Sequence, residues 1–201
     1  MFAFATFIGS LVRNPSKVGS LAPSSSALSR RLASLVPGDA ACVVEIGAGT
    51  GSVTRALLER GIPGERLWVL ELDPQLASFL RQEFPQARVL CGDARELSQL
   101  LPKEVMGRVD CVVSGLPLRS LGENIRREVI RSSFASLRPG GALLQFTYGL
   151  RSPITNVKET KITRERIGRV WTNFPPATVW RYRKSTHESL SSVTVADRKV
   201  V

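Results

Sequence analysis

Strand-like and helix-like stretches alternate along the chain from Ala40 to Tyr148, and this alternation restricts the fold more than any other feature. Short runs rich in Val, Leu and Ile are each followed by a stretch with apolar residues at helical spacing. This order predicts a parallel sheet with helices on both faces. The expected strands are CVVEIG, RLWVLELD, ARVLCGD, VDCVVSGLP and GALLQFTYG.

The alternation stops after Tyr148, where RVWTNF and TVWRYRK predict two further strands joined by a turn at Pro175-Pro176. At least one of them is expected to be antiparallel to the rest. A length of 201 residues fits one α/β domain with its own core. The expected helices are SSSALSRRLASLVP, TRALLERG, PQLASFLRQEF, ARELSQLLP and NIRREVIRSSFASL, the last ending at Arg138-Pro139-Gly140-Gly141.

Three glycines, Gly47, Gly49 and Gly51, follow the first expected strand at its junction with a helix. Glycine suits this position because the backbone turns sharply and approaches a ligand without a Cβ in the way. The spacing differs from the dinucleotide fingerprint, since the third glycine comes one residue early and leaves Ser52 at the small packing position. Glu45, two residues before Gly47, would repel a pyrophosphate but tolerates a ligand that carries an ammonium group.

Polar residues also end the next expected strands. Glu71 comes about twenty residues after the glycines, where a carboxylate can accept hydrogen bonds from both ribose hydroxyls. Asp93 ends the third strand, where a carboxylate can accept from an adenine amino group, and Ser114 ends the fourth. Because the carboxyl ends of parallel strands meet at one edge of a sheet, these side chains and Glu45 are predicted to converge on one crevice.

This arrangement resembles the class I S-adenosylmethionine-dependent methyltransferases. The resemblance implies a Rossmann-like α/β fold, with a mostly parallel sheet in the strand order 3-2-1-4-5-7-6 and strand 7 antiparallel. The two late runs fit the final hairpin. It also implies S-adenosyl-L-methionine as the cofactor, bound by Glu45, Gly47, Gly49, Gly51, Glu71, Asp93 and Ser114. A dehydrogenase and a scaffold without activity are the alternatives.

The fourth strand ends in Ser114-Gly115-Leu116-Pro117-Leu118, which resembles the Asn-Leu-Pro-Tyr loop of the ribosomal RNA adenine dimethyltransferases. Ser114 replaces the amide of that loop, and Leu118 replaces the aromatic residue that would stack on a flipped base. The chain also ends soon after the last strand, where an RNA-recognition domain would follow. These departures favour an acceptor other than a nucleic acid.

A wider resemblance, over about residues 4 to 184, is to the bacterial phospholipid N-methyltransferases. It implies methylation of phosphatidylethanolamine and its partly methylated forms towards phosphatidylcholine, while related enzymes act on ornithine lipids. Under this resemblance the carbonyls of Ser114 and Leu116 hold the acceptor amine, and Tyr148 orients it or passes its proton on. The stretches that carry the likeness are residues 13–25, VSGLPL, RPGGALLQFTYG and IGRVWTNFPPATVWRYRK.

The charge of the chain is concentrated in its flanks: +4 over residues 1–38, zero over 39–150 and +7 over 151–201, for +11 overall. Basic flanks indicate a polyanionic partner, either a nucleic acid or an anionic membrane, or charge for solubility alone. Phe4, Ile8 and Leu11 form one apolar helical face, which either anchors the protein at a membrane interface or packs on the sheet.

From these features we expect three segments: an amphipathic, basic helical segment at 1–38 that contacts the membrane and acts as a lid, a methyltransferase domain at 39–185, and a flexible tail at 186–201. The lack of a signal peptide or of an apolar stretch long enough to span a bilayer predicts a cytoplasmic protein. The basic flanks and the lipid substrate implied by the resemblance predict a peripheral location on the inner face of the membrane, and a monomer is expected. No metal site is expected, because Cys42, Cys91 and Cys111 share no ligand spacing and are predicted to be small core residues. His187, the only histidine, is expected to be solvated.

Overall fold

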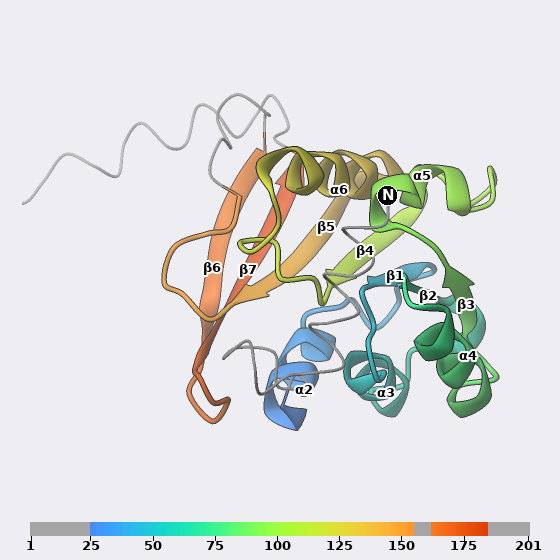
Figure 1. Cartoon of the computed structure of the whole chain (residues 1–201), viewed down its shortest axis with the longest axis horizontal. Helices are drawn as coiled ribbons and strands as arrows, with labels where there is room; N and C mark the ends of the chain where they lie inside the picture. Colours follow the sequence, from blue (N-terminus) through green and yellow to red (C-terminus); the bar gives the residue numbers. More distant parts are fainter. Residues whose placement is uncertain (1–24, 155–161, 185–201) are drawn as a thin grey trace, which may run out of the picture.

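The structure is a computed structural model that describes residues 25–154 and 162–184 (Figure 1). The predicted helical face at residues 4–11, His187 and the expected tail lie outside these ranges. The elements are, in chain order, α2 (Ser26–Ser34), β1 (Val43–Ile46), α3 (Ser52–Glu59), η1 (Gly64–Arg66), β2 (Leu67–Glu71), α4 (Pro74–Glu83), β3 (Arg88–Cys91), η2 (Ala94–Glu96), α5 (Leu97–Leu100), β4 (Val109–Ser114), α6 (Glu123–Ser136), β5 (Leu137–Thr147), β6 (Ile162–Val170) and β7 (Ala177–Lys184).

The strands form one 7-stranded sheet in the order β3-β2-β1-β4-β5-β7-β6, which confirms the predicted topology. Strands β1 to β5 pair in parallel, whereas β7 is antiparallel to both β5 and β6. The carboxyl ends of β1, β2, β3 and β4 therefore share one edge of the sheet. Thr147, at the end of β5, pairs with Thr178 near the start of β7, so the turn between β6 and β7 lies at that same edge.

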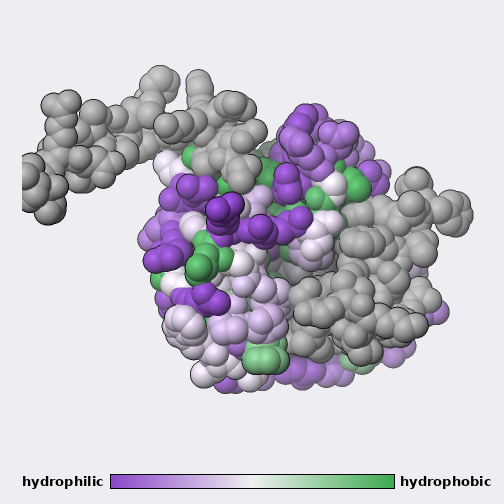
Figure 2. All heavy atoms as spheres, turned by 60° about the vertical axis from the view of Figure 1, so that its left-hand side comes forward, coloured by the Kyte–Doolittle hydropathy of each residue, from purple (hydrophilic) through white to green (hydrophobic). Residues whose placement is uncertain are grey.

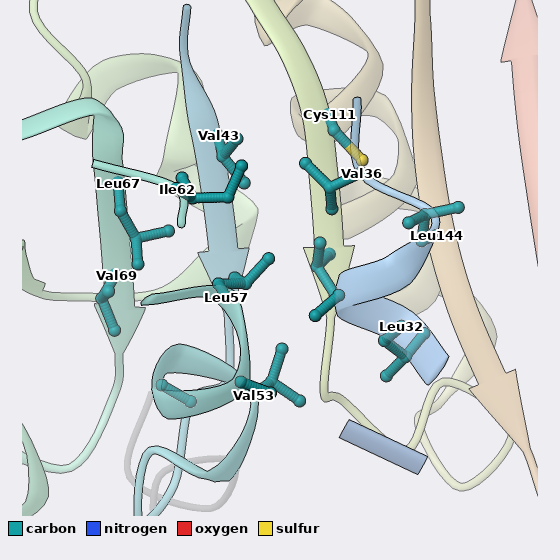
Figure 3. Close-up of a cluster of buried hydrophobic side chains, with 14 of the residues drawn as sticks. Leu32, Val36, Val43, Val53, Leu57, Ile62, Leu67, Val69, Cys111 and Leu144 are labelled. Carbon is teal, nitrogen blue, oxygen red and sulfur yellow. The ribbon is translucent and has the colours of Figure 1, made fainter. Parts of the chain in front are cut away.

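Helices cover both faces of the sheet, as predicted: α2, α3 and α4 lie on one side and α5 and α6 on the other (Figure 1). Leu32 of α2 and Leu57 of α3 are fully buried against strand residues such as Val43 and Val69 (Figure 3). Helix α2 is thus part of the domain core, although it belongs to the sequence segment expected to contact a membrane. Burial of this apolar surface is the main contribution to the stability of the layers.

Two helices begin where their sequences predict. The Ser25 side chain caps α2 by accepting a hydrogen bond from the Leu28 amide at 3.3 Å. Asp73 caps α4, and Pro74 occupies the first helical turn, where its missing N–H has no cost.

Two element boundaries were predicted wrongly. Strand β6 begins at Ile162, so most of RVWTNF is the turn after β6 rather than a strand. The charged stretch Thr163–Arg166 lay outside the predicted strand, but an edge strand with one unpaired side tolerates exposed charged residues. Strand β5 begins at Leu137, within the stretch expected to end α6, and its pairing with β4 is irregular between Val109 and Cys111.

The cysteines also differ from expectation. Cys111 is buried as predicted, whereas Cys42 is half-buried and Cys91 is exposed at the end of edge strand β3. Within residues 25–154 and 162–184, no cluster of three or more His, Cys, Asp or Glu residues could hold a metal ion. No helix of the same ranges is long and apolar enough to cross a membrane.

The sheet encloses one carboxylate of strand β1. Glu45 is 1% exposed, and its Oε2 accepts a hydrogen bond from the Thr54 hydroxyl of α3 at 2.5 Å. Burial raises the pKa of Glu45 from an ordinary 4.5 to about 8, with the Thr54 hydrogen bond opposing the rise and the charge of Glu71 adding to it. Glu45 therefore keeps its proton in the folded protein over a pH range in which the unfolded chain has lost it.

This difference predicts that the folded protein loses stability as pH rises between the two pKa values. Glu45→Gln keeps an acceptor for Thr54 but cannot ionise. The unfolding free energy of the variant minus that of the wild type should therefore grow by about 1 kcal/mol or more between about pH 5 and about pH 9. Urea unfolding of both proteins at the two pH values measures the change, and an equal difference at both would contradict the buried, protonated carboxylate.

Candidate functional site

The glycine turn after β1 lies against the loop after β4. Gly47 has φ +70, and a Cβ built on it would lie 2.4 Å from the Leu116 Cδ2 atom. Both the backbone conformation and the lack of space therefore require glycine here. Gly51, with φ +80, precedes α3 and packs as closely against the Phe84 ring. The turn brings the N-terminus of α3 to the edge of the sheet.

Glu71 fixes this turn from the end of β2. Its Oε2 accepts a hydrogen bond from the Gly49 amide at 2.8 Å, and its Oε1 accepts from the amides of Leu72 and Asp73 at 2.8 and 3.0 Å. A carboxylate has about four acceptor positions, so one remains for a ligand hydroxyl. The side chain is 2% exposed and therefore well ordered for that contact.

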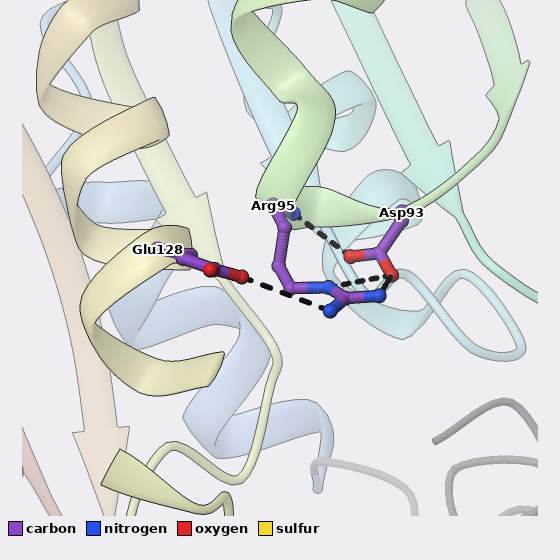
Figure 4. Close-up of polar contacts among 3 residues, drawn as sticks. All are labelled: Asp93, Arg95 and Glu128. Carbon is purple, nitrogen blue, oxygen red and sulfur yellow. Dashed lines mark hydrogen bonds and ion pairs between the residues drawn. The ribbon is translucent and has the colours of Figure 1, made fainter. Parts of the chain in front are cut away.

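Asp93 lies beyond β3 and is bound to Arg95, a contact that the sequence did not predict. Asp93 Oδ2 accepts from both Nε and Nη2 of Arg95 at 2.9 and 2.7 Å, and Oδ1 accepts from the Arg95 amide (Figure 4). Arg95 also reaches Glu128 of α6 at 3.7 Å. The sequence offered one signal for the contact between Arg95 and Asp93, since the two residues are only two positions apart. Asp93 thus has limited acceptor capacity left for an adenine amino group, and this role stays a prediction.

A hollow lies between the carboxyl ends of β1, β2 and β3. Its lining combines an acidic group, two glycines and apolar side chains: Gly47, Leu70, Glu71, Leu72, Gly92, Ala94 and Leu116. Of the predicted cofactor residues, the structure places Gly47 and Glu71 in this lining. Gly49 is held beside it by Glu71, whereas Glu45 lies behind the turn, bonded to α3. A carboxylate beside a glycine turn that leaves no room for a Cβ is an arrangement that suits a ribose hydroxyl held close to the backbone.

The loop after β4 is held by two polar residues. The Ser114 hydroxyl accepts a hydrogen bond from the Leu116 amide at 3.4 Å. Gln145 of β5, paired in register with Ser114, donates from Nε2 to the carbonyls of Leu116 and Phe146 at 3.0 and 2.7 Å. The role of Gln145 was not predicted from the sequence, although Gln145 is the one polar residue within the apolar run ALLQF. It fixes a carbonyl that was predicted to hold the acceptor.

A second cavity, of about 200 Å³, lies on the other side of Leu116. It is lined by two chain segments, Gly115–Ser120 and Phe146–Gly149. Leu116 borders both the hollow and this cavity, so the two spaces adjoin at this residue. None of the lining residues is acidic, and Arg119 supplies a positive charge. Its Nη1 donates a hydrogen bond to the Arg151 carbonyl at 3.1 Å.

Tyr148 lines this cavity, as its predicted role requires. Burial raises the pKa of its phenol, and a hydrogen bond with the Asn173 side chain only partly offsets the rise. The ring meets Phe146 edge to face, with centroids 5.6 Å apart. Tyr148 therefore stays protonated at neutral pH and can orient an acceptor but is a poor base.

Residues 43–141 match the family model of a methyltransferase domain. Ornithine lipid N-methyltransferase of Singulisphaera acidiphila is 38% identical to the chain over 148 residues, which cover 72% of this chain and 77% of that protein. Ribosomal RNA small subunit methyltransferase A of Chlorobium chlorochromatii is 51% identical over only 51 residues, or 25% of this chain and 18% of that protein.

Solved structures share the fold at low sequence identity. A TehB-like SAM-dependent methyltransferase from Corynebacterium glutamicum has a TM-score of 0.61 at 18% identity, covering 92% of this chain and 100% of that one. The 1,6-didemethyltoxoflavin-N1-methyltransferase of Burkholderia thailandensis, solved with S-adenosylhomocysteine, has a TM-score of 0.65 at 18% identity, with coverage of 92% and 89%. Together with the glycine turn, the Glu71 carboxylate and the sheet order, these matches identify the chain: it belongs to the class I S-adenosylmethionine-dependent methyltransferases, and its cofactor is S-adenosylmethionine.

Proposed function

We propose that the protein transfers a methyl group from S-adenosylmethionine to the amine nitrogen of a membrane aminolipid headgroup. The observation that carries this proposal is the shared wall at Leu116, which places an acceptor cavity directly beside the cofactor hollow. The 38% identical relative named for ornithine lipid supports an aminolipid acceptor. Ornithine lipid and phosphatidylethanolamine are the two candidate headgroups, since each presents a primary amine beside an anionic group.

Methyl transfer to an amine is a displacement in which the nitrogen lone pair forms the new C–N bond as the C–S bond breaks. The bound cofactor supplies a methyl group already activated by a sulfonium sulfur, so positioning of the acceptor is the main task of the protein. The Leu116 carbonyl has a second lone pair beside the one that Gln145 occupies, and it can accept a hydrogen bond from the amine. Gln145 thereby fixes the direction of that acceptor.

The acceptor nitrogen must be neutral to attack. Because the cavity lining has no carboxylate and Tyr148 keeps its proton, the amine gives up its proton to water rather than to a lining side chain. Arg119 favours the same neutral form by its positive charge, and it can pair with the phosphate or carboxylate of the headgroup.

An RNA acceptor is less well supported. Leu118 occupies the position of the aromatic residue on which a flipped base would stack, and its own side chain is only 2% exposed. The loop therefore presents no flat aromatic ring to a base. The matched stretch of the ribosomal RNA methyltransferase from Chlorobium chlorochromatii is a small part of that protein. The basic flanks are then better matched to an anionic membrane surface, and we place the protein on the cytoplasmic face of the membrane.

The acceptor is tested by incubating purified protein with methyl-labelled cofactor and, separately, ornithine lipid, phosphatidylethanolamine and ribosomal RNA. Label should appear in one or both lipids, on nitrogen, and be absent from RNA. Gly47→Ala is the inactive control, because its Cβ would collide with Leu116. Label in RNA alone would overturn the lipid assignment.

Gln145→Leu removes the hydrogen bond that fixes the Leu116 carbonyl, so it should lower kcat on the lipid substrate at least about tenfold. Because Gln145 does not line the cofactor hollow, the Kd of the cofactor should stay within about twofold. The change removes the donor that two buried carbonyls share, so urea unfolding of the variant accompanies the kinetics, and kcat is compared under conditions in which the variant is folded and binds the cofactor. Exposed Gln82→Leu is the matched control. An unchanged kcat for Gln145→Leu would remove this residue from the mechanism.

A further inference from the structure

The β6–β7 hairpin ends at the same edge of the sheet as the acceptor cavity. Val170 and Ala177 are its last paired residues, and Thr178 pairs with Thr147, which lines the cavity. The Asn173 side chain in the turn accepts a hydrogen bond from the Ser25 amide at 3.2 Å, and it is near enough to the Tyr148 phenol of the cavity to lower the pKa of that group. The turn is therefore held close to the place where the acceptor enters.

Large apolar side chains are exposed at this end. Trp171 is 71% exposed, Phe174 is 92% exposed, and Leu150, just after the cavity lining, is 60% exposed. Among the described residues, the only other large apolar side chain exposed to a comparable degree is Phe79 of α4, at 44%. Exposed aromatic residues gathered at one end mark an interaction surface, and tryptophan is enriched where proteins meet the interface of a bilayer.

Arginines accompany the aromatic residues. Arg164, Arg166 and Arg169 of β6 are opposite Tyr182, Trp180 and Thr178 of β7 and so share one face of the hairpin. Arg169 stacks on the Trp171 ring at 4.6 Å. Glu165 points to the other face, where it pairs with Arg181 at 3.2 Å, and no carboxylate of the described residues pairs with the three arginines. In Figure 2, strongly hydrophilic side chains gather in the upper part of the coloured face, and a paler area lies below them, towards the hairpin end.

We infer that the hairpin end, defined as Trp171 and Phe174 with Leu150 and the arginines Arg166 and Arg169, docks the protein on an anionic lipid bilayer. The aromatic side chains insert at the level of the headgroups, and the arginines pair with lipid phosphates. Since the turn adjoins Tyr148, docking places the cavity mouth at the membrane surface. The hairpin end consists of other residues than the helical face predicted at residues 4–11, and its docking rests on the proposed function, whose lipid specificity it deepens.

Vesicle flotation with the full chain tests the docking. The vesicles contain phosphatidylcholine alone or with about a third of phosphatidylglycerol, so that neither lipid carries a methylatable amine. The wild type should float with the anionic vesicles, and Trp171→Ser/Phe174→Ser should bind them at least about tenfold more weakly. Phe79→Ser is the matched control and should bind as the wild type does. Equal binding by the double variant, or binding of RNA but not of vesicles, would overturn the inference.

Tryptophan fluorescence gives a second readout that does not depend on the folding of the double variant. Trp68 and Trp180 are each 8% exposed, so Trp171 is the tryptophan positioned to meet lipid. Vesicles with brominated acyl chains should quench the wild-type emission and leave that of Trp171→Phe almost unchanged; equal quenching of both proteins would contradict the docking. These vesicles hold no acceptor amine, so docking is measured separately from methylation. Docking here, without label in the lipid assay described above, would overturn only the proposed acceptor. Label in that assay, without docking here, would overturn only the inference about the hairpin end.

Discussion

The close approach of Leu116 to Gly47 governs how this domain is organised. Only a glycine with a positive φ lets the loop after β4 rest on the turn after β1. Leu116 borders both the hollow and the cavity, and its carbonyl accepts a hydrogen bond from Gln145. Methyl transfer requires the reacting atoms to come within about 3–3.5 Å of each other, so we expect the two spaces to open to each other beside Leu116 when donor and acceptor are bound.

The charges of the site are arranged by sheet position. Glu71, at the end of β2, borders the hollow, whereas Glu45 of β1 keeps its proton and Asp93 after β3 is paired with Arg95. The cavity beyond β4 has arginine and no acid in its lining. Further along the sheet, the β6–β7 hairpin adds arginines and exposed aromatic side chains. The sheet thus passes from a side with a carboxylate to an arginine-rich edge, an order that suits a cationic cofactor and the proposed anionic lipid surface.

Much of this was predictable from the sequence. The glycine turn, the acids at strand ends and the resemblance to known methyltransferases were enough to predict the full strand order. Contacts that depend on side-chain direction were not. Gln145 was read only as part of an apolar strand, and the bond of Arg95 to Asp93 depends on a rotamer that residue spacing does not determine. The strand was predicted at RVWTNF, about seven residues too late, so Trp171 and Phe174 were assigned to a strand and their exposure in the turn was missed.

A crystal structure of the protein with S-adenosylhomocysteine tests the central claim most directly. A ribose hydroxyl should bond to Glu71, and the sulfur should contact the Leu116 side chain, facing the cavity lined by Tyr148. A ligand whose ribose lies away from Glu71, or whose sulfur is separated from Leu116, would contradict the common wall between donor and acceptor.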